Sequence, residues 1–209
     1  RNLPDDSPDA EDLDLVIRET KRCASIIRRL LDFSREKTPE KSYTNLNLLI
    51  EDTVQLVAQA AQLNDIEIIT DLNEELPVLW LDENLVKQVI MNMLVNAQHA
   101  IKNEGRINIS TRLISASDCP ESIAEPGDMA EVTISDSGSG ISEDDLKRIF
   151  DPFFTTKGVG KGTGLGLSVS HGTIEAHGGV IEVSSTVGEG TEFRIYLPAG
   201  GPGDRGDES

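Results

Sequence analysis

A glycine-rich segment, GVGKGTGLG over residues 158–166, constrains the fold of this chain more than any other feature. It holds five glycines in nine residues, and an apolar pattern of helical period begins inside it at Leu165 and Leu167. Backbone N–H groups in such a segment lie at the positive end of the following helix, where they can bind phosphate groups. Lys157 and Lys161 add positive charge. A flexible linker is the alternative, and the helical pattern disfavours it.

The glycine order fits neither of two common phosphate-binding motifs. A dinucleotide-binding fingerprint should lie in a parallel βαβ unit, and the pattern around this segment predicts none. A P-loop requires the order G-x-x-x-x-G-K-[ST], which is absent from the sequence.

Hydrophobic periodicity predicts alternating helices and strands along the chain. The predicted helices cover 48–63, 82–102 with Asp82 as N-cap, 143–149 with Ser142 as N-cap, and 166–177. The predicted strands cover 66–72, 106–113, 131–135, 180–185 and 191–197, with a solvent loop at 115–128. This order predicts an α/β fold, a two-layer sandwich of helices on a largely antiparallel sheet.

The N-terminal part has a different pattern. Residues 1–12 are polar and are predicted to form a loop, and 13–36 show an amphipathic helix whose apolar stripe resembles a heptad seam. This helix either docks on its own domain or joins a bundle with a partner, and we favour the bundle. We therefore divide the chain into an N-terminal loop and helix at 1–40, a folded α/β domain at 41–199, and a disordered tail at 200–209.

Composition narrows the function classes. The formal net charge is −18, which disfavours nucleic-acid binding because such proteins carry basic patches. Cys23 and Cys119 lack metal spacing and are expected to be small apolar residues in a reducing compartment. The sequence has no apolar run of ~18 residues, so we expect no membrane contact from this chain. Because it begins with Arg1, we expect it to be part of a longer protein, whose membrane attachment stays open.

The helix predicted at 82–102 carries a polar stripe, Gln88, Asn92, Asn96 and His99, on an otherwise apolar element. Asparagine is a poor helix-interior residue, so two of them one turn apart need a reason. A carboxamide oxygen is a neutral, hard ligand suited to Mg²⁺. An exposed polar face is the alternative, and the stripe alone does not decide between them.

Two further motifs lie between this helix and the glycine-rich segment. Asp136-Ser-Gly138-Ser-Gly140 follows a strand, where a carboxylate could accept the exocyclic amine of a purine; alone, an ordinary Asp/Gly loop is the better interpretation. The segment from Phe150 to Lys157 holds three of the five phenylalanines. It is either a hinged lid that packs its aromatic rings on closing or local core packing.

The order of these motifs resembles the catalytic domain of sensor histidine kinases. An Asn-x-x-x-Asn helix, Asp-x-Gly-x-Gly, the Phe-rich segment and Gly-Thr-Gly-Leu-Gly-Leu correspond to the N, G1, F and G2 boxes, over about residues 45–198. Phe-Phe-Thr-Thr-Lys looks like the nitrogen-sensor type. Residues 22–34 look like the second helix of the dimerisation and phosphotransfer domain. The wider superfamily includes ATPases of gyrase, heat-shock chaperones and mismatch repair.

The resemblance implies the cofactors ATP and Mg²⁺ and a role for each matched residue. Asn96 would hold Mg²⁺, Asn92 and Lys157 would be catalytic, and Asp136 would bind the adenine amine. Residues 155–166 would form a lid over ATP. The implied nucleotide-binding residues are Asn92, Asn96, Asp136, Gly138, Gly140, Lys157, Lys161, Gly162, Thr163, Gly164, Leu165, Gly166 and Leu167.

The implied activity is that of a protein-histidine kinase in a cytoplasmic homodimer. The γ-phosphoryl group would pass from ATP to a histidine outside this chain, then to an aspartate of a response-regulator receiver domain. His99 stands where many kinases place lysine; it, His171 and His177 are expected in local structural roles. The alternatives are a gyrase- or chaperone-type ATPase, disfavoured because Asn92 replaces a glutamate base, and a degenerate nucleotide-binding interaction domain.

Overall fold

The computed structural model describes residues 13, 16, 17 and 20 and the ranges 39–123, 127–157 and 162–201. Of the predicted N-terminal helix, Leu13, Val16, Ile17 and Thr20 are helical, and the three apolar side chains among them are exposed. The rest of that helix and most of the predicted tail lie outside the described residues, so the domain division stays a prediction. Among the described helices, none is long and apolar enough to span a bilayer.

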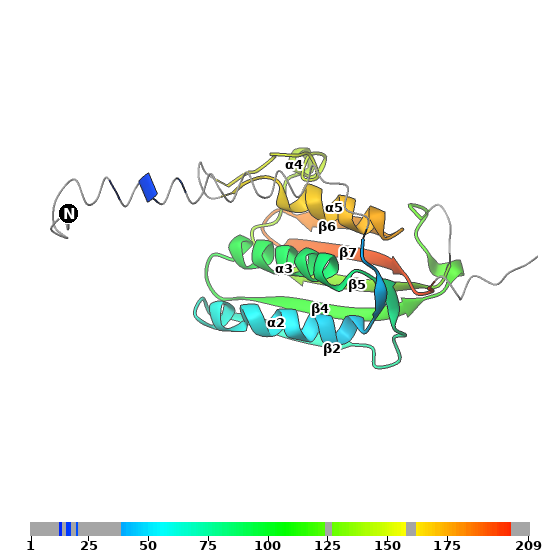
Figure 1. Ribbon diagram of the computed structural model, residues 1–209. Coiled ribbons are helices and arrows are strands. Elements are labelled where there is room, and N and C mark those ends of the chain that lie inside the picture. The colour runs from blue at the N-terminus through cyan, green and yellow to red at the C-terminus, as the bar shows by residue number, and fades with distance from the viewer. Residues whose placement is uncertain are drawn as a thin grey trace, which may run out of the picture.

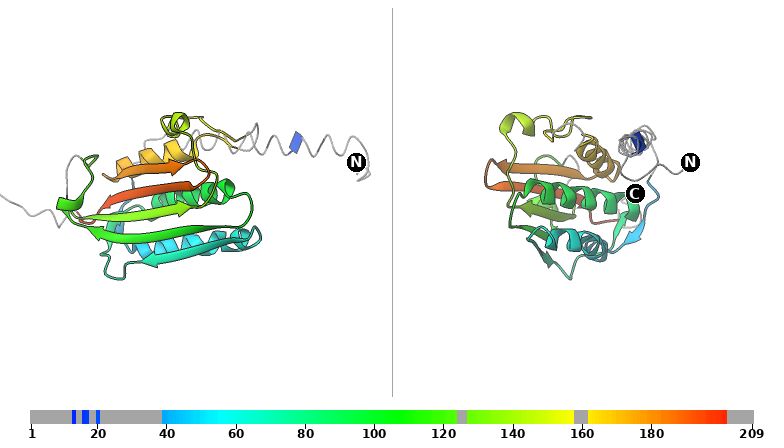
Figure 2. Two further views of the ribbon diagram at one scale, coloured as in Figure 1. Left: turned by 180° about the vertical axis from the view of Figure 1, so that it is seen from behind. Right: turned by 90° about the vertical axis from the view of Figure 1, so that its left-hand side faces the viewer.

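Five strands form one sheet in the order β2-β4-β5-β7-β6. The strands β2 and β4 pair in parallel, and the other pairs are antiparallel. Helices lie on one face of this sheet (Figure 1), and the left view of Figure 2 looks onto the other face. The two-layer α/β sandwich predicted from the sequence is confirmed. The strands are β2 (Ile66–Leu72), β4 (Gly105–Ile114), β5 (Met129–Asp136), β6 (Val180–Thr186) and β7 (Gly190–Pro198), and the helices are α2 (Leu46–Gln62), α3 (Glu83–Ala100) and α5 (Gly166–Ala176).

The core lies between the helices and the sheet, with α3 at its centre. The apolar stripe of α3 is buried, including Val86, Ile90 and Leu94, which belong to one cluster with Ile107 and Ile134 of the sheet. Full burial of such a side chain contributes about 1.5–3 kcal/mol. The polar stripe on α3 is therefore held at a fixed height above the sheet, facing the region between α3 and α5.

Some details of the elements differ from the prediction. The helix α4 covers only Glu143–Leu146, shorter than the predicted 143–149, because turns with Arg148 N donating to Asp145 O and Asp151 N to Arg148 O follow it. A small antiparallel sheet, β1 (Ser42–Thr44) with β3 (Leu79–Leu81), was not predicted, because three residues are too few to show a period of two.

A cluster of hydrogen bonds, here called the junction cluster, joins residue 40 to α3 and α5. The Asp82 carboxylate caps α3 by accepting from Leu85 N at 3.1 Å and also accepts from Glu40 N at 2.9 Å. His177 Nε2 accepts from Asp82 N at 3.0 Å, and its Nδ1 donates to Thr173 O at 2.7 Å. The start of α3 and the end of α5 are thereby fastened together, so the two helices run antiparallel.

Candidate nucleotide site

The polar stripe of α3 opens onto a cavity of about 740 Å³ between α3, α5, the loop after β5 and the segment before α5. The residues predicted to bind nucleotide converge here from distant parts of the chain. Those that line the cavity are Asn92, Asn96, Asp136, Gly140, Lys157, Gly162, Thr163, Gly164, Leu165, Gly166 and Leu167. Gly138 lies beside the cavity, packed on Ala100 and Asp136, and Lys161 lies outside the described residues.

Asp136, the last residue of β5, presents a carboxylate at one wall of the cavity. Its Oδ1 accepts from Gly138 N at 2.8 Å, and the backbone N–H of Thr191 is a further donor. Burial raises the pKa of Asp136, partly offset by these two hydrogen bonds. A partly buried carboxylate that faces open space is suited to accept hydrogen bonds from an amine. Thr191, buried and lining the same wall, was missed by the sequence reasoning because nothing local marks it.

The loop after Asp136 is braced by the β6–β7 hairpin. Ser185 Oγ accepts from Ile141 N at 2.8 Å, and Gly188 N donates to Ser139 O at 2.9 Å. Gly140 has φ +67°, and a Cβ there would overlap the carbonyl oxygen of Thr186. The hairpin therefore requires glycine at this position and fixes the shape of the loop.

Asn92 lies between α3 and α5. Its Nδ2 donates to the Oγ of the buried Ser170 at 3.1 Å, and a Cβ on Gly166 would overlap its carboxamide. Gly166 is thus required for the close approach of α5 to Asn92. Ser170 is a second residue that the sequence reasoning missed, because its position on α5 suggests only a small buried side chain.

Lys157 crosses the cavity mouth to reach α3. Its Nζ donates to Asn96 Oδ1 at 3.0 Å and lies 3.1 Å from His99 Nδ1. Burial lowers the pKa of Lys157. Burial also lowers the pKa of His99, and the charge of Lys157 lowers it further. His99, which we expected in a local structural role, lines the cavity and contacts Lys157, a predicted catalytic residue.

The phenylalanine segment frames the cavity. Phe154 lines it, with the guanidinium of Arg148 4.6 Å from its ring centroid, whereas Phe153 is exposed at φ +67°. Phe150 and Phe154 are partly buried against the core, so local packing accounts for two of the three rings. Gly164 has φ +66°, and a Cβ there would overlap the backbone of Phe153.

The donor set fits Mg²⁺ only together with a nucleotide. Within the described ranges, no group of three His, Cys, Asp or Glu side chains could hold a metal ion. The Asn96 carboxamide supplies one neutral oxygen. Mg²⁺ commonly takes one or two protein ligands and completes its shell with phosphate oxygens and water. The site therefore suits a metal that arrives with phosphates.

Comparisons with known proteins agree with this geometry. Residues 81–201 match the family described as histidine kinase-, DNA gyrase B-, and HSP90-like ATPase. The chain is 39% identical over 195 residues to sensor kinase CckA of Brucella abortus and 38% identical over 195 residues to the histidine-protein kinase AtoS of Escherichia coli. These matches cover 91% and 93% of this chain but only 20% and 30% of the relatives.

Solved structures give the same result. The catalytic domain of histidine kinase ThkA matches with a TM-score of 0.65 and 31% identity, over 77% of this chain and 96% of that one. Full-length ShkA in complex with AMPPNP matches with a TM-score of 0.75 over 92% of this chain and 39% of that one; at 22% identity it shows the fold alone. The chain belongs to the family of histidine kinase-, DNA gyrase B- and HSP90-like ATPases. Within that family, it is the ATP-binding catalytic domain of a sensor histidine kinase.

Proposed function

We propose that this domain binds Mg-ATP in the cavity and passes the γ-phosphoryl group to a histidine supplied from outside the chain. The observation that carries the proposal is the convergence in one cavity of Asp136 with Asn92, Asn96 and the glycines before α5. A carboxylate suits the amine of adenine, and amide oxygens and backbone N–H groups suit Mg²⁺ and phosphates.

In this proposal, each group of residues has a role that follows from its position in the cavity. Asp136 would accept a hydrogen bond from the adenine amine, Asn96 Oδ1 would hold Mg²⁺, and Lys157 with the backbone of 162–166 would bind the phosphates. Mg²⁺ neutralises charge on the phosphates when it is bound. Phosphoryl transfer needs mainly positioning and charge neutralisation, and these groups supply both. Asn92 cannot take a proton from water, which favours transfer to an imidazole over hydrolysis.

In this proposal, the acceptor histidine lies outside this chain. The chain has three histidines. His177 is buried with both ring nitrogens hydrogen-bonded, and His171 lies 3.2 Å from Glu175 on the surface of α5. His99 is directed to Lys157. None of these positions resembles an imidazole presented on a separate helix.

Onward transfer to a response-regulator receiver domain is the second part of the proposal. It is supported by a solved complex of histidine kinase ThkA with the response regulator TrrA, which matches this chain with a TM-score of 0.73 and 26% identity, over 97% of this chain and 55% of that one. A homodimer is proposed from the apolar residues Leu13, Val16 and Ile17, which are exposed at helical spacing.

Calorimetric titration of Mg-ATP tests the proposal. We expect saturable binding by the unsubstituted chain and a roughly 10- to 100-fold weaker affinity for Asp136→Asn, because the new amide group turns a donor toward the adenine amine. Asp71→Asn, on the exposed side of β2, removes the same charge far from the cavity and should bind normally. Equal affinity of Asp136→Asn and the unsubstituted chain would refute the assigned adenine contact.

A phosphorylation assay completes the test. The chain should leave itself unlabelled and should label a separately supplied helix that carries the acceptor histidine. Rapid ATP hydrolysis without any labelled histidine would instead support an ATPase of the gyrase type.

A further inference from the structure

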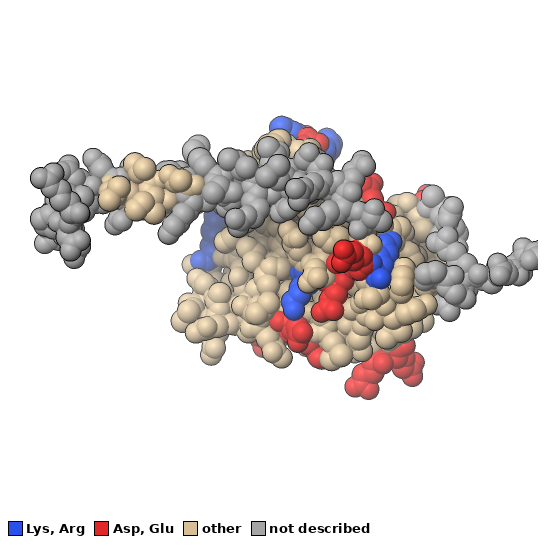
Figure 3. Space-filling model, viewed as in Figure 1, with Lys and Arg blue, Asp and Glu red and all other residues tan. Residues whose placement is uncertain are grey.

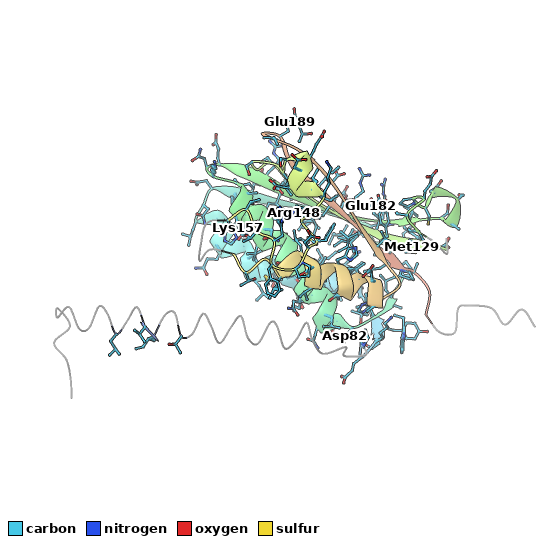
Figure 4. The ribbon with its side chains drawn as sticks, turned by 90° about the horizontal axis from the view of Figure 1, so that it is seen from above. Asp82, Met129, Arg148, Lys157, Glu182 and Glu189 are labelled. Carbon is cyan, nitrogen blue, oxygen red and sulfur yellow. The ribbon has the colours of Figure 1, made fainter. Side chains whose placement is uncertain are left out.

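The contact between Lys157 and α3 joins the start of the lid to the far wall of the cavity. Asn96 and His99 are one turn apart, so both face the same side of α3. The Lys157 ammonium bonds to both, across sequence separations of 61 and 58 residues. At its other end, Lys157 N donates to Thr155 Oγ1 at 3.2 Å. The lysine is thus held from its backbone to its tip (Figure 4, where it is labelled).

The chemistry of the two side chains fixes the direction of one bond. A lysine ammonium has three donors and no acceptor, so His99 Nδ1 must accept and the ring proton lies on Nε2. This requires a neutral imidazole, and the lowered pKa of His99 agrees with one. The two bonds to α3 leave the ammonium capacity for one further acceptor.

We propose that His99 is a positioning residue for Lys157: its Nδ1 holds the ammonium at the cavity mouth, ready to bind the phosphates of an incoming Mg-nucleotide. This inference rests on the proposed function, since it gives a reason for a contact between a lid residue and the N-box helix. His99 acts through Lys157 and has no assigned contact with the nucleotide.

The expected competition between Lys157 and Mg²⁺ for Asn96 gives His99 its role in holding Lys157. The oxygen that accepts from Lys157, Asn96 Oδ1, is also the proposed Mg²⁺ ligand. An ammonium and Mg²⁺ on the same oxygen would lie only a few ångströms apart and repel each other. We therefore expect Lys157 to leave Asn96 Oδ1 if that oxygen holds the Mg²⁺ of Mg-ATP. The bond to His99 then keeps the ammonium beside the phosphates, whereas without His99 a long, flexible side chain would have to be ordered again.

Substitutions of His99 test this proposal by Mg-ATP titration. His99→Leu removes the acceptor and should weaken affinity roughly three- to tenfold, the range expected for one ordinary hydrogen bond, because His99 acts on the nucleotide only through Lys157. His99→Asn places a carboxamide oxygen near the Nδ1 position and should restore affinity to within about twofold. His171→Leu, at a half-buried histidine of α5 that packs against Phe150 and not against Lys157, is the control and should bind normally.

A measurement without nucleotide separates positioning from a general structural effect. In ¹⁵N NMR spectra of the unsubstituted chain, His99 should be the neutral Nε2–H tautomer, and Lys157→Met should remove the hydrogen-bond shift of its Nδ1. A protonated Nδ1, or full Mg-ATP affinity in His99→Leu, would overturn the inference while leaving the proposed function intact. No Mg-ATP binding by the unsubstituted chain would overturn both.

Discussion

The two ends of the antiparallel pair α3 and α5 carry polar clusters of opposite character. At the junction cluster, both carboxylate oxygens of Asp82 and both ring nitrogens of His177 have protein partners within 3.1 Å. At the cavity, Asn92, Asn96 and Asp136 are partly exposed and face open space. Polar groups that hold the fold together are saturated by the protein, whereas those at the cavity keep capacity for a ligand.

Burial shifts the pKa of one titratable group at each end of the helix pair. It lowers the pKa of His177 and raises the pKa of Asp136, and in both cases it disfavours the charged form. The neutral form of His177 is the one that the junction cluster uses. For Asp136, the charged form is the one that would accept an amine, so burial there opposes the folded state until a donor arrives.

The face of the molecule seen in Figure 3 gives no comparable contrast. The face seen in Figure 3 carries Lys and Arg as separate side chains among acidic and uncharged ones. Figure 4 labels Lys157 and Asp82 in well-separated parts of the molecule, and they mark the two clusters. Substitutions at one cluster should therefore change stability, and substitutions at the other should change binding.

The largest expected effect on stability comes from His177→Ala. The substitution leaves the buried Asp82 N–H and the Thr173 carbonyl without their partner and opens a cavity, so we expect a loss of about 2–4 kcal/mol of unfolding free energy. Urea denaturation measures this, with His171→Ala, at a half-buried histidine of α5, as the control. The Mg-ATP affinity of the folded protein should change by less than about twofold. A larger loss of affinity at unchanged stability would contradict the assignment of His177 to stability and not to binding.

The pH dependence of stability should have opposite signs at the two ends. The folded-state pKa of His177 lies below 6.5, so the unfolded chain binds its proton first and this stability is lost as the pH falls below 6.5. The folded-state pKa of Asp136 lies above 3.8, so its contribution is full below pH 3.8 and is lost as the pH rises through the folded value.

Unfolding free energies between pH 8 and pH 4, compared with those of His177→Gln and Asp136→Asn, isolate the two contributions. The difference between the unsubstituted chain and His177→Gln should shrink as the pH falls. As the pH falls, the unfolding free energy of the unsubstituted chain should rise relative to that of Asp136→Asn. If the unfolding free energies of the unsubstituted chain and of either variant changed in parallel with pH, the substituted residue would make no pH-dependent contribution to stability.

The smallest expected effect tests whether the helix pair itself is under strain. Gly172 lies in α5 between the two clusters, and a Cβ there meets no atom within 4 Å. Gly172→Ala should raise the unfolding free energy by about 0.5–1 kcal/mol, because alanine loses less backbone entropy in a helix. Thermal unfolding measures the gain. A destabilised Gly172→Ala would indicate that α5 needs flexibility between the clusters.

The sequence alone determined the features that depend on neighbouring residues. Asp82 caps α3 because its side chain reaches a backbone N–H three residues on, and strand β2 spans 66–72 as its alternation predicts. The glycines of 158–166 indicated phosphate binding because a helix follows directly. The ordered set of motifs identified the family, since each motif alone was weak.

Only the tertiary structure decided which distant side chains meet. Lys157 reaches Asn96 and His99, and Asn92 reaches Ser170, across separations of 58 to 78 residues. Thr191 joins Asp136 because β5 and β7 pair in a register that places Asp136 opposite it. Periodicity reports which face of an element is buried, but the partner across a cavity depends on how several elements pack together, and no local pattern in the sequence carries that information.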